Sequence, residues 1–232
     1  LRARYYGEIT YIDQCLGRIL DAVEAREDAD DTLICFFSDH GDHLGDHDAW
    51  QKESFFEVSC HVPFLMSWPA RLARNERRGE LACLTDLFAI ATSAAGALET
   101  REGFDMLGVA EGSAAPREYL FGFYGEPGTP QFKVMVRYRQ WKYIFMANGE
   151  REQLFDLATD PRELKQLLEI RSDEARHLRQ AAVGALDNPA GAAGLARGDL
   201  KSFPFAERPL KRIYQFDRSR GVEGFPDRPE DL

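Results

Sequence analysis

Ser38–His47 reads SDHGDHLGDH and directly follows the apolar run Thr32–Phe37. An apolar run of that length, with no polar alternation, is typical of a strand that is buried on both faces. We therefore expect a strand over residues 32–38 inside a mostly parallel sheet, with Asp39 and His40 directly after its end. The end of such a strand is where ligands bind in open α/β sheets.

Asp39 and His40 offer a carboxylate and an imidazole side by side. A hard cation prefers oxygen ligands and accepts an occasional imidazole, so this pair predicts part of a metal site. Two ligands do not fill a coordination sphere, and the remaining ligands would come from elsewhere. Lys52 returns to the same place with a positive charge. The alternative is a solvated acidic loop in which the glycines serve only to form turns.

The segments around this loop resemble a known family. Residues 38–52, followed by residues 61–69, resemble the second-half signature of the sulfatases, which belong to the alkaline phosphatase superfamily. Residues 5–20 are similar to the family's helix before that strand, and residues 154–163 resemble its carboxy-terminal LYDLxxDPxE element. The resemblance covers roughly residues 1–170 in the family's order.

The resemblance implies a role for each polar residue of the loop. Asp39 and His40 would hold a divalent cation, with Ca²⁺ expected first and Mn²⁺ or Mg²⁺ as alternatives. Lys52 would be catalytic and contact the oxygens of the ester. His47 would either steer the loop through a hydrogen bond or make a purely structural bond, and His43 could face the substrate. Many sulfatases have Asn where His40 stands, whereas the phosphonate and phosphodiester hydrolases of the superfamily, and some sulfatases, have His. His40 therefore leaves the substrate open.

The catalytic nucleophile of the family has no counterpart in this sequence. A sulfatase oxidises a cysteine in a C-x-P-x-R context to formylglycine, and none of Cys15, Cys35, Cys60 and Cys83 has that context. The resemblance therefore implies a carboxy-terminal portion that is inactive alone, with the formylglycine segment expected upstream. Its partner would be that amino-terminal half or a second copy of the chain. A non-catalytic binding half is the other interpretation.

Composition and net charge limit which classes of partner the chain can bind. The chain has 232 residues, is 44% hydrophobic and carries a formal net charge of −10. It is thus globular, and its charge disfavours nucleic acid as a partner. A sulfate-ester small molecule or a sulfated sugar would have to be attracted locally. We expect no membrane span. The four unpatterned cysteines indicate no disulfide framework, which favours a reducing, cytoplasmic compartment.

The pattern along the chain predicts an α/β protein in three parts. Residues 1–117 would form the second half of a catalytic domain, with part of a mixed, mostly parallel sheet flanked by helices. Residues 118–200 would form a small antiparallel sheet with helices, and residues 201–232 an extended tail. We expect an amphipathic helix over 3–26 that packs on the sheet. Further helices are expected over 81–97, 161–168 and 173–186, and further strands over 62–68, 118–124, 131–137 and 141–146.

Overall fold

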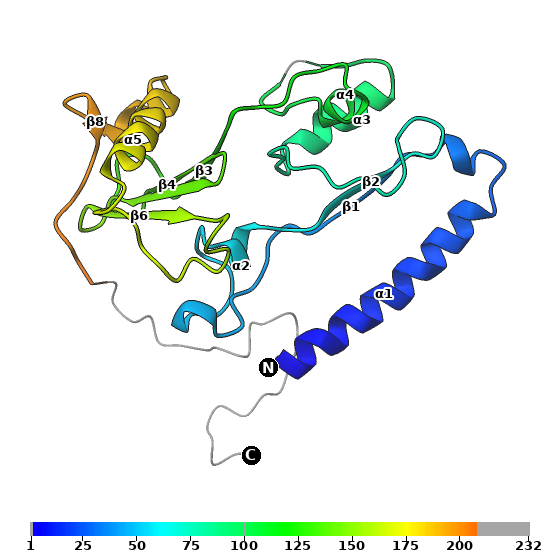
Figure 1. The fold of residues 1–232 in the computed structure, drawn as a ribbon, viewed down its shortest axis with the longest axis horizontal. Coiled ribbons are helices and arrows are strands. Elements are labelled where there is room, and N and C mark those ends of the chain that lie inside the picture. The colour runs from blue at the N-terminus through cyan, green and yellow to red at the C-terminus, as the bar shows by residue number, and fades with distance from the viewer. Residues whose placement is uncertain (1, 100, 208–232) are drawn as a thin grey trace, which may run out of the picture.

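The computed structural model describes residues 2–99 and 101–207, so the predicted tail from residue 208 onward lies outside the described residues. The α-helices are α1 (Arg2–Glu24), α2 (Glu57–Cys60), α3 (Asp86–Ala94), α4 (Met106–Glu111) and α5 (Ser172–Leu186). The strands are β1 (Ile34–Phe37), β2 (Phe64–Ser67), β3 (Tyr119–Tyr124), β4 (Lys133–Tyr138), β5 (Trp141–Met146), β6 (Arg151–Asp156), β7 (Leu195–Ala196) and β8 (Asp199–Leu200). Figure 1 shows their arrangement.

The first sheet consists of one antiparallel pair of strands. Strands β1 and β2 lie next to each other and run antiparallel, with Cys35 opposite Met66 and Phe37 opposite Phe64. Parallel neighbours need a long crossover, usually a helix. The connection over residues 38–63 holds only short helical turns, the longest being the four residues of α2. The α/β class is confirmed, and the short connection accounts for the antiparallel direction of this pair.

Helices α3 and α4 cover one face of this sheet. Their contact forms a core of five buried side chains, which are Trp68, Ile90, Met106, Leu107 and Val109. On the other face Phe36 is 36% exposed and Leu65 is 57% exposed. Among the described residues no element covers that second face, so the apolar run is buried on one face only in this chain.

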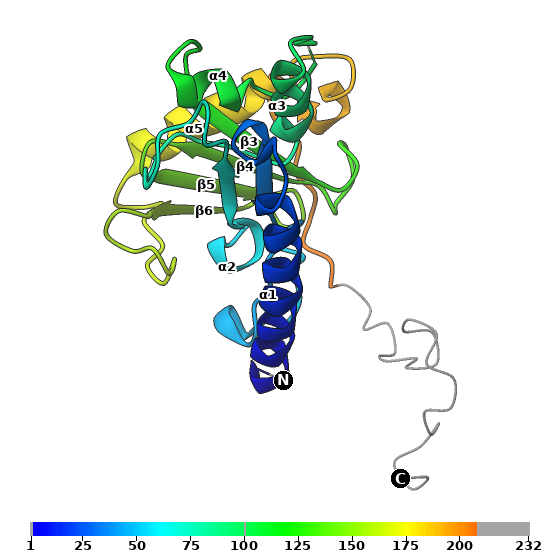
Figure 2. The same ribbon diagram turned by 90° about the vertical axis from the view of Figure 1, so that its right-hand side faces the viewer.

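Helix α1 forms where the apolar spacing predicts it, but it does not pack as expected. It runs alongside the β1–β2 pair but stands apart from it (Figures 1 and 2), and none of its residues is buried. The expected packing on the sheet is thus not found, because the described residues put no element against its apolar side. The large apolar side chains left exposed on this helix are Tyr5, Tyr6, Ile9, Tyr11, Ile12 and Ile19.

The predicted small antiparallel sheet is confirmed as β3-β4-β5-β6. Side chains of a strand alternate between the two faces, and one set, including Val134, Tyr143 and Phe145, packs against α5. A polar network supports that packing, because Arg179 of α5 pairs with Glu152 of β6 and with Asp199 at 2.8 Å. Helix α5 therefore closes one face of the sheet.

The opposite face of the same sheet lies under the loop that carries the candidate site. Met135, Ile144 and Phe155 form its apolar centre, and Phe55 and Phe56 pack on them. Gly122 of β3 allows this approach, because a Cβ there would lie 2.8 Å from a ring atom of Phe55. The sheet thus serves as a floor beneath the segment that follows Lys52.

Some elements differ from the sequence expectation. Residues 161–168 form turns rather than a helix, and the chain is held there by Lys165 N donating to Asp160 Oδ2 (2.7 Å) and Leu167 N donating to Leu154 O (2.9 Å). Helix α4 and the short β7–β8 pair were not predicted. Within residues 2–99 and 101–207, no helix is both long and apolar enough to cross a membrane.

A buried ion pair generates the first prediction. Asp86 is fully buried, accepts hydrogen bonds from the backbone N–H groups of Cys83 and Phe104, and pairs with Arg117. Asp86→Asn leaves the guanidinium without its charge partner, so we expect a loss of about 3–5 kcal/mol in the free energy of unfolding in urea. Asp28→Asn removes an exposed pair with Arg26, which water and salt screen, and should cost much less stability. Equal losses in the two variants would contradict this assignment.

Candidate functional site

The loop between β1 and α2 is built from left-handed backbone turns. Leu44, His47, Asp48 and Gln51 all have φ between 50° and 66°, and Gly45 has φ of 95°. Such conformations are uncommon for residues with a side chain and persist only where surrounding contacts enforce them. Five left-handed residues within eight positions indicate that contacts within the loop fix its shape.

Backbone hydrogen bonds across the loop bring its two arms together. His43 N donates to Gln51 O at 2.8 Å, and Gly45 N donates to Ala49 O at 2.9 Å. The Asp42 carboxylate adds a bond from Leu44 N at 2.8 Å. The chain therefore turns back on itself, and Lys52 returns next to His40.

The structure brings together the three residues that the sequence predicts at the centre of the site. His40 Nδ1 lies 2.8 Å from Gly41 O, and because a carbonyl only accepts, Nδ1 carries the hydrogen in this contact. In the neutral ring, His40 Nε2 is then the nitrogen with a free electron pair. That atom lies 3.2 Å from Asp39 Oδ2 and 2.5 Å from Lys52 Nζ.

This geometry fits one part of a cation site. The Asp39 carboxylate and the His40 Nε2 electron pair face each other, which is unfavourable unless positive charge lies between or beside them. The side chain of Asp39 is 79% exposed and that of His40 is 37% exposed, so both are accessible. Among the described residues, no group of three or more His, Cys, Asp or Glu side chains gathers as a metal site. The loop thus offers two ligands.

The other two histidines of the loop hold its interior. His43 is 3% exposed, with its ring nitrogens 3.1 Å from Asp46 O and 2.7 Å from Ser54 Oγ. The ring of His47 stacks on Phe56 with 3.9 Å between ring centroids. Both rings therefore lie between the loop and the segment that packs on the sheet, and His43 points away from solvent.

Helix α2 connects to both arms of the site. Gly41 N donates to Ser59 O at 2.8 Å, and the Ser59 hydroxyl donates to Lys52 O. A Cβ at Gly41 would lie 2.1 Å from Val58 O, so only glycine fits this close approach. One turn of helix thus fixes the backbone beside His40 and the backbone of Lys52.

A buried charge cluster lies directly beneath α2. The fully buried Lys142 Nζ of β5 lies 2.7 Å from Glu57 Oε1 and 2.8 Å from Glu163 Oε1. Glu163 Oε2 also accepts a hydrogen bond from Glu57 N at 2.5 Å. Glu163 is the last residue of the LYDLxxDPxE-like element, whereas Lys142, Glu57 and Ser59 carry no signal in the sequence, since a lone lysine in a strand-like pattern does not indicate its partners.

The same cluster perturbs the acid–base behaviour of Glu57. Burial alone would raise the pKa of its carboxyl group, but the hydrogen bond with His61 and the charge of Lys142 outweigh burial and lower the pKa to about 2. His61 Nδ1 lies 2.9 Å from Glu57 Oε2, and this contact raises the pKa of His61. Glu57 is therefore ionised at neutral pH.

Asp46 ties the loop to two distant parts of the chain. Arg2 at the start of α1 lies 2.9 Å from Asp46 Oδ1, and its Nε donates to Leu44 O at 2.7 Å. Arg162 approaches Asp46 Oδ2 at 3.9 Å. Helix α1 and the turn at residues 160–163 therefore both meet the site loop.

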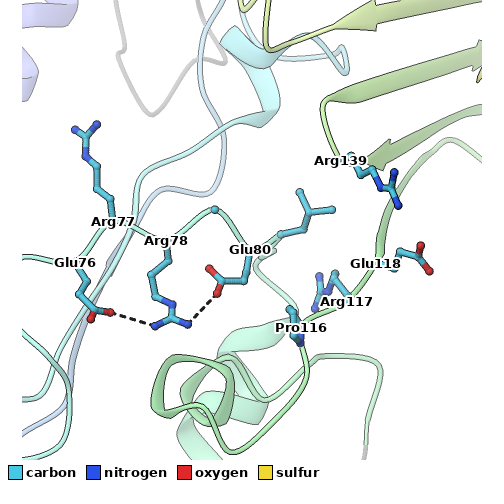
Figure 3. Close-up of a pocket in the computed structure, with 10 residues that line it drawn as sticks. Glu76, Arg77, Arg78, Glu80, Pro116, Arg117, Glu118 and Arg139 are labelled. Carbon is cyan, nitrogen blue, oxygen red and sulfur yellow. Dashed lines mark hydrogen bonds and ion pairs between the residues drawn. The ribbon is translucent and has the colours of Figure 1, made fainter.

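A separate open hollow of about 680 Å³ lies between residues 76–81, residues 116–118 and Arg139. Its lining is rich in arginine, but carboxylates already pair with much of that charge. Figure 3 shows Arg78 between Glu76 (3.1 Å) and Glu80 (2.9 Å). None of Asp39, His40 and Lys52 lines this hollow, so it is distinct from the candidate site.

Comparison with known proteins points to one family. Residues 1–97 match the sequence model described as "Sulfatase". The choline-sulfatase of Rhizobium meliloti (strain 1021) is 33% identical over 176 residues, which cover 72% of this chain and 33% of that protein. The chain thus spans about a third of the length of this curated relative. The resemblance that the motifs suggest is confirmed.

Solved structures share the fold. The phosphonate monoester hydrolase of Agrobacterium radiobacter aligns with a TM-score of 0.66 and 28% identity, over 78% of this chain and 40% of that one. A protein solved in complex with its substrate D-glucosamine-2-N,6-O-disulfate aligns with a TM-score of 0.68 and 21% identity, over 79% and 40% of the two chains. The second likeness is evidence of the fold alone.

The lowered pKa of Glu57 predicts an acid-dependent loss of stability. Its folded pKa, about 2, lies below its ordinary value of 4.5, so its contribution is complete above about pH 4.5 and is lost as the pH falls toward 2. Urea unfolding of the wild type and of Glu57→Gln across this range measures the effect. The wild type should lose stability more steeply, and parallel curves would contradict the role of Glu57.

Proposed function

We propose that this member of the sulfatase family supplies the metal-binding loop and the ester-binding lysine of an enzyme that hydrolyses sulfate esters. One observation carries the proposal: Asp39, His40 and Lys52 converge at an accessible loop directly after a strand. Since the chain spans about a third of its choline-sulfatase relative, the activity is proposed for the complete protein.

The proposed roles of the site residues follow from their charges. Asp39 and His40 would bind a divalent cation, for which we propose Ca²⁺, with Mn²⁺ or Mg²⁺ as alternatives. When bound, the cation withdraws electron density from the oxygens of the ester. Lys52 would turn its ammonium from His40 Nε2 to an ester oxygen, where it stabilises the negative charge that develops.

The nucleophile would be a formylglycine in the amino-terminal part of the complete protein. None of the four cysteines in this sequence has the C-x-P-x-R context for that oxidation. In the structure all four are partly buried thiols. We therefore propose that the 232-residue chain has no turnover by itself.

The substrate that we propose is a sulfate-ester small molecule or a sulfated sugar. The choline-sulfatase relative supports a sulfate ester as the substrate. With a formal net charge of −10, the chain gives an anionic substrate no general attraction, so the local positive charge of the cation and Lys52 would bind it.

A second candidate is hydrolysis of a phosphonate monoester or a phosphodiester. The phosphonate monoester hydrolase of Agrobacterium radiobacter shares the fold at 28% identity. Assay of the complete protein with an aryl sulfate, a phosphonate monoester and a phosphodiester separates the two. A third candidate is a non-catalytic binding half, and absence of all three activities would favour it.

The uncovered apolar surface indicates a partner. Phe36 and Leu65 on the open face of the first sheet, and the apolar side of α1, are exposed in this chain. An apolar surface of this kind favours association. We propose that an amino-terminal half covers it in the complete protein and that a second copy covers it when the chain is alone.

Replacement of Lys52 tests the catalytic role. In the complete protein, Lys52→Ala should lower kcat for the ester by about 10²–10³-fold, because one charged donor to the developing negative charge is lost. Lys165→Ala, which removes an exposed lysine far along the chain, serves as the matched control and should leave kcat unchanged. Wild-type kcat in Lys52→Ala would remove Lys52 from the site.

Light scattering tests the association. Light scattering should give the isolated chain a molar mass that is a multiple of its 26.3 kDa. Leu65→Glu should lower this mass toward that of the monomer, because it places a charge on the exposed face of the sheet. Glu76→Lys, a charge change at another exposed position, is the control and should leave the oligomer intact. A monomeric wild-type chain at micromolar concentration would contradict the proposed covering of this face.

A further inference from the structure

The buried cluster beneath α2 suggests a role for residues that do not touch the candidate site. Helix α2 is a single turn of four residues, and a helix of that length is not stable without outside support. Its first residue, Glu57, receives that support from Lys142 and Glu163, at 2.7 Å and 2.5 Å. The helix is therefore held by the second sheet and by the turn that follows it.

The same helix holds the two arms of the site. Ser59 O accepts the bond from Gly41 N, next to His40, and the Ser59 hydroxyl donates to Lys52 O. Ser59 is 2% exposed, so both bonds are shielded from competing water. A continuous series of contacts thus runs from Lys142 through Glu57 and Ser59 to Lys52.

The two carboxylates and the ammonium in this series are stable in a buried place only because their charges offset each other. Lys142 is buried between two carboxylates, those of Glu57 and Glu163, with His61 on the far oxygen of Glu57. Without the ammonium, the two carboxylates would repel each other across a buried space, and Glu57 would have to move toward solvent. Because Glu57 begins α2, that movement would carry Ser59 with it.

We infer that Lys142 and Glu163 are positioning residues that set the distance between His40 and Lys52 through α2. This inference deepens the proposed function and rests on it for the meaning of that distance. It assigns a use to the carboxy-terminal sheet: the sheet carries the ammonium that keeps the loop closed. A shift of about 1 Å in a group that binds the reacting ester can cost about 10²-fold in rate.

Arg179 offers a matched control for this inference. It also lies in a charge network of the second sheet, with Glu152 and Asp199, but on the face covered by α5. Its replacement should lower the stability of the sheet without touching α2. The comparison of Lys142→Met with Arg179→Met therefore separates positioning from general stability.

Amide hydrogen exchange measured by NMR on the 232-residue chain is the direct test. Relative to amides in β4, exchange at Gly41 should rise at least about tenfold in Lys142→Met and stay unchanged in Arg179→Met. An equal rise in both variants would overturn the inference. If Lys142→Met does not fold, Glu163→Gln should give a selective rise of smaller size at Gly41, and no selective rise there would overturn the inference too.

Kinetics of the complete protein give a second measurement. Lys142→Met should lower kcat by about 10²-fold with little change in KM, and Arg179→Met should lower neither. If the wild-type protein hydrolyses no ester, the proposed function fails while the exchange result still decides the positioning role. If the wild type is active and Lys142→Met retains its kcat, the positioning role fails and the proposed function stands.

Discussion

The ammonium of Lys142, buried between Glu57 and Glu163, is the interaction on which the site depends. A charge in such a place is stable only with partners at hydrogen-bonding distance, and those partners come from α2 and from the turn after β6. The pairing therefore joins the two sheets of the chain at the point where the site loop ends. The loop takes its closed shape from this junction and from its own left-handed turns.

The sequence predicted the second sheet well because its signals are local. Phe132, Val134 and Val136 recur at every second position leading into and along β4, and the Asn148-Gly149 pair is typical of a hairpin turn between β5 and β6. Both signals can be read without reference to the rest of the chain. The pairing of β1 with β2 was not predictable in the same way. An apolar run such as Thr32–Phe37 indicates a buried strand but says nothing of its neighbour's direction, and in this chain one of its faces is open.

In the site, too, local sequence signals were predictive and contacts between distant segments were not. Asp39, His40 and Lys52 were predicted because their order in the loop matches a family signature, and the structure brings them together. The supporting residues Lys142 and Ser59 gave no signal, since their roles come from contacts between segments far apart in the sequence. His43 shows the converse: its place in the motif suggested a substrate contact, whereas the fold buries its ring beneath the loop.

We propose that Asp39 and His40 share one divalent cation with ligands supplied by the rest of the complete protein. Anomalous scattering from crystals of the complete protein grown with Mn²⁺ tests it most directly. We predict a peak within about 2.0–2.6 Å of an Asp39 carboxylate oxygen and of His40 Nε2, the range of metal–ligand bonds in proteins. A peak elsewhere, with Asp39 and His40 free of it, would contradict the claim.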